Sequence, residues 1–231
     1  EPEISDLADL LNKMGAKVQG AGTEVITVDG VQSLHSTTYT IPADRIEAGT
    51  YLVATAITGG KIKINSIQPD RLNTVIERLK MSGAIIEVEE NSISLNMQNK
   101  RPLPVDISTS PFPGFPTDMQ AQFSVLNALA SGDSIVEENV FENRFMHVQE
   151  LNRMGCSIST HGNTATITGV NKISGAQVMA TDLRASASLI LAGLVADGET
   201  IVDRIYHIDR GYERIEEKLS YLGANITRLP S

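Results

Sequence analysis

Residues 180–202 read ATDLRASASLILAGLVADGETIV, and this stretch defines the unit from which the chain is built. Asp182 is a favoured N-cap residue, because its side chain can accept hydrogen bonds from the free amides at the start of a helix. The residues after it are rich in alanine and leucine, which favour a helix, and Gly198 suits the turn that ends it. Thr200-Ile201-Val202 is typical of a strand. The stretch therefore predicts a helix followed by a strand.

The same pattern occurs twice more along the chain. Residues 42–64 open with Pro42-Ala43-Asp44, and residues 116–136 open with Pro116-Thr117-Asp118. Each continues through an apolar stretch to a glycine and then to a segment typical of a strand. A pattern that recurs at a fixed interval indicates repeated structural units.

A second helix belongs to each unit and ends at a glycine. Leu72, Val75, Ile76 and Leu79 have the three- and four-residue spacing of an amphipathic helix. Glycine suits the left-handed residue that closes such a helix, because it has no Cβ atom. The four helix ends are Met14-Gly15-Ala16, Met81-Ser82-Gly83-Ala84, Met154-Gly155-Cys156 and Leu222-Gly223-Ala224, with intervals of 68, 72 and 68 residues between the glycines.

Alternating segments after these glycines predict strand hairpins. Residues 85–88 and 93–95 flank the turn residues Glu90-Asn91, for example. The complete unit is therefore strand, helix, strand, helix, strand, strand. On this count the chain begins at the second helix of one copy, carries two whole copies, and stops before the last hairpin strand of the next. We interpret it as an excised piece of a longer protein.

Composition places the chain among ordinary globular proteins. It has 231 residues, of which 41% are hydrophobic and 20% are charged, and a formal net charge of −9. That charge argues against a general nucleic-acid binder, since phosphate backbones are held by Lys and Arg. The single cysteine excludes an internal disulfide, and no apolar stretch is long enough for a membrane span or a signal peptide. We expect a cytoplasmic protein with no metal and no cofactor.

Four motifs resemble one protein family. The motifs are FPTDMQAQF at residues 115–123, FENRFMH at 141–147, SGAQVMATDLRA at 174–185 and VDRIYHIDRGYE at 202–213. Together they resemble the enolpyruvyl transferases, and within that family the enzymes that act on UDP-N-acetylglucosamine. The resemblance covers essentially the whole chain, in order.

The resemblance implies an α/β fold, an inside-out α/β barrel of repeated βαβαββ units with helices inside and sheets outside. It implies two domains with an active-site cleft between them. Residues 1–41 would be the C-terminal tail of the other, mostly absent domain, and residues 42–231 would form a three-repeat domain that contributes half of the cleft. The missing N-terminal half would carry a reactive loop cysteine and a Lys-Asn pair, so we expect this chain alone to be inactive.

The reaction implied by the resemblance moves the enolpyruvyl group of phosphoenolpyruvate to the 3-hydroxyl of UDP-N-acetylglucosamine and releases phosphate, the first committed step of peptidoglycan synthesis. Such chemistry needs a base for the hydroxyl proton, cationic groups for the phosphate and carboxylate, and donors that face developing charge.

The resemblance assigns catalytic roles to Asp118, Asp182 and Arg210. Asp118 matches the base beside the sugar hydroxyl, and Asp182 matches a second carboxylate of the cleft. The alternative is helix capping, because an Asp stands at the same place in all three copies. Asp44, the third of these residues, is interpreted only as a cap.

The same resemblance assigns substrate binding to Asp118 and to five further residues. Arginine suits phosphoenolpyruvate because its planar fork binds carboxylate and phosphate in pairs and stays charged. Ion pairing with nearby acids is the alternative for the arginines, and a core position is the alternative for the Val-Phe pair. The five residues are Val140 and Phe141, along the sugar nucleotide, and Arg144, Arg184 and Arg210, toward phosphoenolpyruvate or the closing cleft.

Cys156 follows Gly155 where alanine stands in the other copies, so we interpret it as a small buried residue rather than as a nucleophile. Two other functions remain open at this point. One is the related enolpyruvyl transferase that acts on shikimate 3-phosphate. The other is a non-catalytic repeat scaffold or binding module, in which the acids cap helices and the arginines pair across interfaces.

Overall fold

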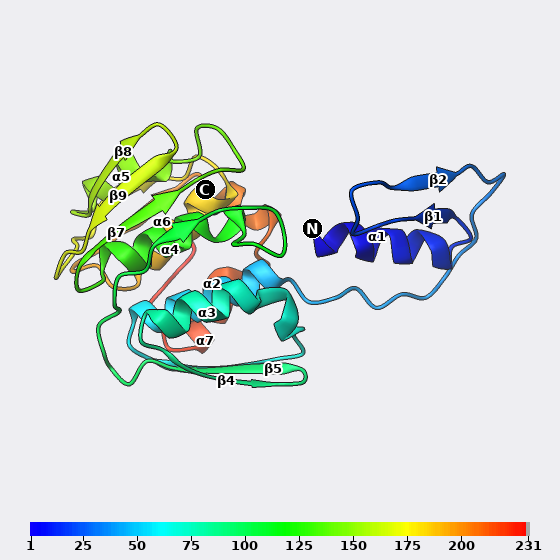
Figure 1. Cartoon of the computed structure of the whole chain (residues 1–231). Coiled ribbons are helices and arrows are strands. Elements are labelled where there is room, and N and C mark those ends of the chain that lie inside the picture. Colours follow the sequence, from blue (N-terminus) through cyan, green and yellow to red (C-terminus); the bar gives the residue numbers. More distant parts are fainter. Residues whose placement is uncertain (230–231) are drawn as a thin grey trace.

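Helices and strands alternate along the chain, as the repeat predicts (Figure 1). The structure is a computed structural model that describes residues 1–229. The first segment holds α1 (Pro2–Lys13), β1 (Lys17–Gln19) and β2 (Thr27–Asp29), and its two strands form an antiparallel pair. This is the helix and hairpin that the sequence predicts for the opening copy.

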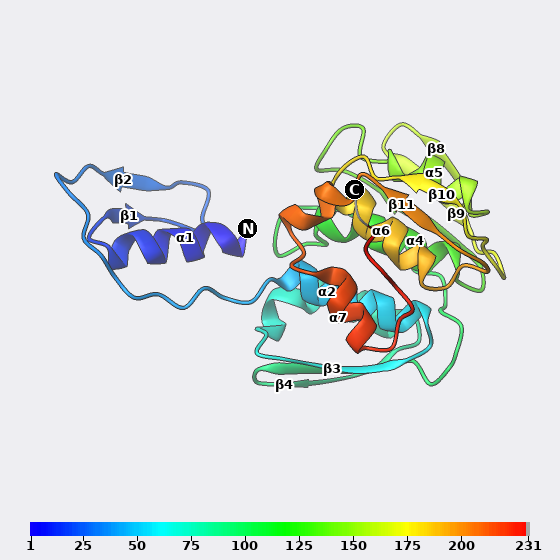
Figure 2. The same cartoon turned by 180° about the vertical axis from the view of Figure 1, so that it is seen from behind.

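The first segment extends away from the rest of the chain in Figures 1 and 2, and ion pairs join its helix to the body. The buried Arg45 side chain contacts Glu1 at 2.6 Å and Glu3 at 2.8 Å. Arg71 holds both carboxylate oxygens of Asp6, at 2.6 and 2.7 Å. Paired arginine–carboxylate contacts of this kind fix orientation as well as distance.

The next copy contains α2 (Arg45–Ile57), β3 (Lys61–Asn65), the short 3-10 helix η1 (Pro69–Leu72), α3 (Asn73–Met81), β4 (Ile85–Glu89) and β5 (Ser92–Asn96). The strands form an antiparallel sheet in the order β3-β5-β4. Residues 30–41, ahead of α2, form no strand. This copy therefore lacks its opening strand, because residues 30–41 pair with no other strand of the described chain. The prediction of two whole copies is wrong on this point.

The following copy is complete. It runs through β6 (Ile107–Ser108), η2 (Thr117–Met119), α4 (Gln120–Ala128), β7 (Asp133–Glu137), α5 (His147–Arg153), β8 (Ser157–His161) and β9 (Thr164–Thr168). The strand order is β6-β7-β9-β8, with β6 and β7 parallel. Because these two strands are parallel neighbours, the loops that leave their carboxyl ends lie at the same edge of the sheet.

The last copy contains β10 (Gln177–Met179), α6 (Leu183–Gly193), β11 (Ile201–Asp203), η3 (Ile205–Arg210) and α7 (Ile215–Tyr221). β10 and β11 pair in parallel, as the β6–β7 pair does. The predicted count places the first strand of a hairpin after α7, but residues 222–229 form no strand, so this part of the prediction is wrong.

The central helices lie between the sheets, as both views show (Figures 1 and 2). All nine residues of α4 are buried, and α4 packs against α2 on one side and α6 on the other. A helix that is buried on every face must be an interior helix. No helix within residues 1–229 is long and apolar enough to cross a bilayer.

Candidate active site

Acidic side chains cap two of the three central helices. Asp44 accepts hydrogen bonds from the amides of Ile46, at 2.7 Å, and Glu47, at 3.1 Å, at the start of α2. Asp182 does the same for Arg184, at 2.8 Å, and Ala185, at 3.0 Å, at the start of α6. The predicted capping role is confirmed for both residues.

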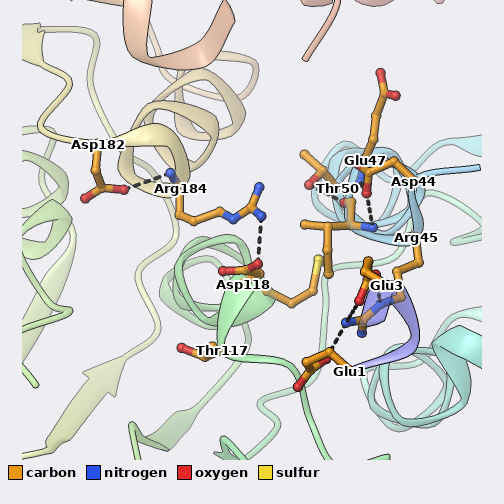
Figure 3. Close-up of polar contacts among 12 residues, drawn as sticks. Glu1, Glu3, Asp44, Arg45, Glu47, Thr50, Thr117, Asp118, Asp182 and Arg184 are labelled. Carbon is orange, nitrogen blue, oxygen red and sulfur yellow. Dashed lines mark hydrogen bonds and ion pairs between the residues drawn. The ribbon is translucent and has the colours of Figure 1, made fainter. Parts of the chain in front are cut away.

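Asp118 departs from this pattern. The 3-10 helix η2, which contains Asp118, directly precedes α4. The Asp118 carboxylate accepts no hydrogen bond from a backbone amide at this helix start. Instead Oδ1 accepts from Arg144 Nη2 at 2.6 Å, and Oδ2 accepts from Arg184 Nη2 at 2.7 Å (Figure 3 shows the Arg184 contact). The capping interpretation is therefore wrong for Asp118, and its carboxylate joins two arginines that come from distant parts of the sequence.

The two guanidinium groups determine the charge of Asp118. Burial alone would raise the pKa of this carboxyl, but Arg184 and Arg144 outweigh burial and hold the pKa below its ordinary value. Burial would likewise lower the pKa of Arg184, whereas the pairing with Asp118 raises it above the ordinary value. At neutral pH the group is thus one anion between two cations, with a net positive charge.

The starts of α2, α4 and α6 face this cluster. Figure 3 shows Asp44, Asp118 and Asp182 on their three helices, with the Arg184 side chain between them. The amino end of a helix carries a partial positive charge and free amides, which favour anions. At α2 and α6 these anions are the capping carboxylates of Asp44 and Asp182 themselves, so the cationic groups of this region are the side chains of Arg144 and Arg184.

A loop after β7 supplies the other side of the cluster. The Arg144 guanidinium lies 4.7 Å from the centre of the exposed Phe141 ring, a cation–π distance. Arg144 Nη1 also donates to Thr117 Oγ1 at 3.1 Å. The structure therefore brings together Phe141, Arg144, Thr117 and Asp118, while Val140 is joined to them through the backbone of the same loop.

Arg210 is not part of this group of contacts. Its side chain is exposed at the end of η3 and forms no ion pair or hydrogen bond with any of residues 1–229. The neighbouring Gly211 lies directly against Leu183, at the start of α6. A Cβ atom added at Gly211 would be only 2.8 Å from Leu183 Cδ2. Arg210 thus lies close to the start of α6.

Sequence reasoning missed two residues of this region, Thr117 and Glu138. Glu138 is buried and accepts a hydrogen bond from Thr117 Oγ1 at 2.8 Å. One signal could have found it: residues 134 and 136 of β7 are buried, and the two-residue period of a strand also points position 138 inward. An acid on the inward side of a strand requires hydrogen-bond partners.

Cys156 is free and buried, and burial raises the pKa of its thiol to about 12. The interpretation of Cys156 as a small buried residue is confirmed. Within the described part of the chain, no three His, Cys, Asp or Glu side chains are arranged to hold a metal ion.

An open hollow of about 440 Å³ lies elsewhere on the molecule. Thr58, Leu129 and Val195 line it, and each follows the carboxyl end of a central helix, whereas Asp118 lies at the opposite, amino ends. This hollow is therefore separate from the acid–arginine cluster.

His147 lies beneath the cluster in a buried position. Burial lowers its pKa to about 4, Arg144 acts in the same direction, and Asp182 opposes them only partly. Its Nε2 atom has no hydrogen-bond partner among the described residues. The imidazole is therefore neutral at physiological pH.

We expect His147 to make stability depend on pH. The unfolded chain binds a proton near pH 6.5, and the folded chain resists protonation down to about pH 4, so stability falls as the pH drops through this window. The free energy of unfolding should fall by about 2 kcal/mol between pH 7.5 and pH 5 through this residue. Urea unfolding over that range should show a smaller fall for His147→Gln. The control His161→Gln changes an exposed histidine and should keep the wild-type dependence; equal slopes in all three proteins would contradict the prediction.

Comparison with known proteins places the chain in a family. The family described as EPSP synthase (3-phosphoshikimate 1-carboxyvinyltransferase) matches residues 1–219. A UDP-N-acetylglucosamine 1-carboxyvinyltransferase from Pasteurella multocida (strain Pm70) is 61% identical over 228 residues, which cover 99% of this chain and 54% of that protein. The chain thus spans about half the length of this curated relative.

Solved structures of two other proteins are also similar to this chain. The enolpyruvyl transferase NikO from Streptomyces tendae superposes with a TM-score of 0.86 at 28% identity, over 98% of this chain and 54% of that one. EPSP synthase from Acinetobacter baumannii superposes with a TM-score of 0.57 at 21% identity, over 71% of this chain and 39% of that one. The second likeness concerns the fold alone.

Proposed function

Because the chain belongs to the EPSP synthase family of enolpyruvyl transferases, we propose that it is half of an enzyme that moves the enolpyruvyl group of phosphoenolpyruvate to the 3-hydroxyl of UDP-N-acetylglucosamine. The observation that carries the proposal is Asp118, held between Arg144 and Arg184 at the amino ends of the central helices. The 61% identity to a UDP-N-acetylglucosamine 1-carboxyvinyltransferase supports this acceptor. The product would enter peptidoglycan synthesis in the cytoplasm.

The arginines would serve phosphoenolpyruvate by exchanging partners. In the structure, Arg144 and Arg184 each donate to Asp118. A phosphate or carboxylate group can accept from the same fork-shaped donors in pairs. Binding of phosphoenolpyruvate would draw the guanidinium groups toward the substrate and free the Asp118 carboxylate.

Asp118 would then act as the base. Its low pKa keeps it ionised at neutral pH, but it makes the carboxylate a weak proton acceptor while both arginines hold it. When the arginines turn to the substrate anion, the pKa of Asp118 rises, and the carboxylate becomes a better acceptor for the 3-hydroxyl proton. The exchange therefore couples substrate binding to activation of the base.

Four further residues would take part in binding or proton transfer. Val140 and Phe141 lie on the loop next to Arg144 and would run along the sugar nucleotide. One oxygen of Asp182 accepts both capping amides, so its other oxygen would be the one that takes part in proton transfer. Arg210, exposed near the start of α6, would close on phosphoenolpyruvate or on the other side of the cleft.

The missing half would complete the cleft and the barrel. We propose that residues 1–41 are the tail of the other domain, and that residues 42–231 form a three-repeat domain of the inside-out α/β barrel type. The separation of the α1–β2 segment from the body supports the first part, and the position of the central helices between the sheets supports the second (Figures 1 and 2). The coverage of 54% of the curated relative supports a missing partner half.

The experiment compares this chain with the full-length protein that contains it. With UDP-N-acetylglucosamine and phosphoenolpyruvate, the full-length protein should release phosphate and form the enol ether, as followed by a phosphate assay and mass spectrometry. The chain alone should release phosphate at the rate of the blank, because half of the cleft and the reactive cysteine are absent. Phosphate release by the chain alone would contradict this second expectation.

Substituting shikimate 3-phosphate for the sugar nucleotide tests the alternative acceptor, which the name of the matching family favours. We expect no product with it. Turnover of shikimate 3-phosphate but not of UDP-N-acetylglucosamine would transfer the assignment to that reaction. An absence of turnover with either acceptor in the full-length protein would favour a non-catalytic role.

A further inference from the structure

A buried carboxylate lies beside the proposed active site without being part of it. Glu138 follows β7 and is only 3% exposed. Its Oε1 accepts from Thr109 Oγ1 at 2.9 Å and from the amides of Val140, at 3.0 Å, and Phe141, at 3.1 Å. Its Oε2 accepts from Thr117 Oγ1 at 2.8 Å. Four donors thus compensate one buried charge, which would be strongly destabilising without them.

These donors come from three separate segments of the chain. Thr109 follows β6, Thr117 directly precedes Asp118, and Val140 and Phe141 form the loop after β7. Because β6 and β7 are parallel neighbours, the carboxyl ends of both strands lie at one edge of the sheet, next to Glu138. The carboxylate therefore ties η2, which carries Asp118, to the loop that carries Arg144.

The hydrogen bond from Thr117 has a direction that matters for the cluster. A threonine hydroxyl has one proton to donate and two lone pairs that accept. Thr117 donates this proton to Glu138, so it meets Arg144 as an acceptor, and Arg144 Nη1 donates to it at 3.1 Å. The other terminal nitrogen of Arg144 donates to Asp118. Glu138, Thr117, Arg144 and Asp118 are therefore joined in one chain of hydrogen bonds, in which Arg144 donates to Thr117 on one side and to Asp118 on the other.

We propose that Glu138 is a positioning residue for the transfer reaction. It fixes the Thr117 hydroxyl as an acceptor for Arg144 and folds the Val140–Phe141 turn, and through these contacts it orients Arg144 against Asp118. This inference rests on the proposed function, since it concerns the geometry of the proposed base and of its cationic partner. Glu138 itself touches no substrate in this scheme.

The substitution Glu138→Gln tests the direction of the chain with little change in shape. Glutamine keeps an oxygen for Thr109, Val140 and Phe141, but its amide nitrogen can only donate toward Thr117. The Thr117 hydroxyl must then rotate to accept this bond, and its proton loses the acceptor that fixed the hydroxyl for Arg144. In the full-length protein we expect kcat to fall about tenfold, because small errors in the position of catalytic groups are costly in rate. The KM for UDP-N-acetylglucosamine should change much less.

The pH profile supplies a readout that general destabilisation would not change. Arg144 is one of the two cations that lower the pKa of Asp118. A weaker Arg144–Asp118 contact raises that pKa, so the acidic limb of the kcat/KM profile, which reports the free enzyme, should move to higher pH. Glu137→Gln is the matched control, because it makes the same change at the exposed neighbouring position of β7. It should keep both the rate and the profile.

Two substitutions of Thr117 test the route through the hydroxyl. Thr117→Val removes the hydroxyl and should move the acidic limb in the same direction as Glu138→Gln, whereas Thr117→Ser keeps the hydroxyl and should retain most of the activity. In the double variant with Thr117→Val, Glu138→Gln should add little, because both changes break one chain. If Glu138→Gln does not fold, the position of the acidic limb in Thr117→Val, compared with that in Thr117→Ser, still tests the inference.

Several outcomes would overturn the inference. Wild-type kcat and an unmoved acidic limb in Glu138→Gln would do so, and so would additive losses in the double variant or an unmoved limb in Thr117→Val. These outcomes differ from a failure of the proposed function, in which the wild-type full-length protein itself shows no turnover.

Discussion

Replacing Asp118 with asparagine in the full-length protein should lower kcat about 10³-fold, a typical loss when a general base is removed. Asparagine has almost the same shape and can still accept a hydrogen bond from one arginine, but it cannot take a proton from the 3-hydroxyl. Since Asp118 accepts no capping hydrogen bond, the change should leave the α4 helix intact. Steady-state phosphate release, with both substrates saturating, measures the effect.

The repeat supplies a matched control for this substitution. Asp44 occupies the equivalent position in the preceding copy and caps α2 with its side chain. Asparagine is about as good an N-cap as aspartate, so Asp44→Asn should retain near-wild-type turnover and stability. A comparable loss of kcat in both variants would point to a shared structural role and would contradict the assignment of Asp118 as the base.

The pH dependence of stability gives a further test of the Asp118 ion pairs. The folded-state pKa of Asp118 is lower than its unfolded value, so its ion pairs stabilise the protein above the unfolded pKa, and this contribution is lost as the pH falls through the folded pKa. Asp118→Asn should therefore flatten the acid side of the stability profile, below about pH 4. Urea unfolding between pH 3 and pH 7 measures the difference.

The sequence predicts the repeated unit well because local physical rules determine it. Each central helix shows an acid at its start, an apolar interior and a glycine after its end, and α2 and α6 follow the pattern with their caps in place. The hairpins β4–β5 and β8–β9 likewise follow from alternation and turn residues. These are signals that act over a few residues.

The departure at Asp118 could not be derived from such local signals. Its two partners lie 26 and 66 residues further along the chain. Only the packing of the loop after β7 and of α6 against the start of α4 brings them to the carboxylate. Two guanidinium groups offer a carboxylate stronger hydrogen bonds than backbone amides do. Long-range pairing therefore overrides the capping preference at one of three equivalent positions.

Other features were hidden for a similar reason. Residues 30–41 form no strand because no neighbouring strand of the described chain pairs with them, and pairing is not a property of a single segment. Arg45 comes directly after the N-cap residue Asp44, where the sequence alone suggests an exposed side chain. The fold instead buries it against Glu1 and Glu3. The site residues proposed by resemblance lie in one connected group, except Arg210, whose side chain makes no contact with the others.

Removing the Arg184 side chain should give the second large effect, on phosphoenolpyruvate rather than on the sugar nucleotide. The Arg184 side chain is 17% exposed and reaches Asp118 from the first turn of α6, so its charge lies where the substrate anion would bind. In Arg184→Ala we expect kcat/KM for phosphoenolpyruvate to fall about 10²- to 10³-fold, the usual loss when a preorganised donor to developing charge is removed. Binding of UDP-N-acetylglucosamine, measured by calorimetry, should change little.

The nature of the loss distinguishes charge from geometry. Arg184→Lys keeps the positive charge but not the planar pair of donors, so it should recover only part of the activity. Arg153→Ala is the control, because it removes an exposed arginine whose contact with Glu150, at 3.6 Å, contributes little. It should leave both constants unchanged.

The partner exchange proposed for Asp118 predicts a further consequence of losing Arg184. Without this cation, the free-enzyme pKa of Asp118 rises, because Arg184 contributes more than Arg144 to lowering it. The acidic limb of the kcat/KM profile should therefore move to higher pH in Arg184→Ala, and less in Arg184→Lys, because lysine retains the charge. A large rate loss with an unmoved limb would show that Arg184 binds phosphoenolpyruvate without controlling the base, and the exchange mechanism would then be wrong even if the arginine is essential.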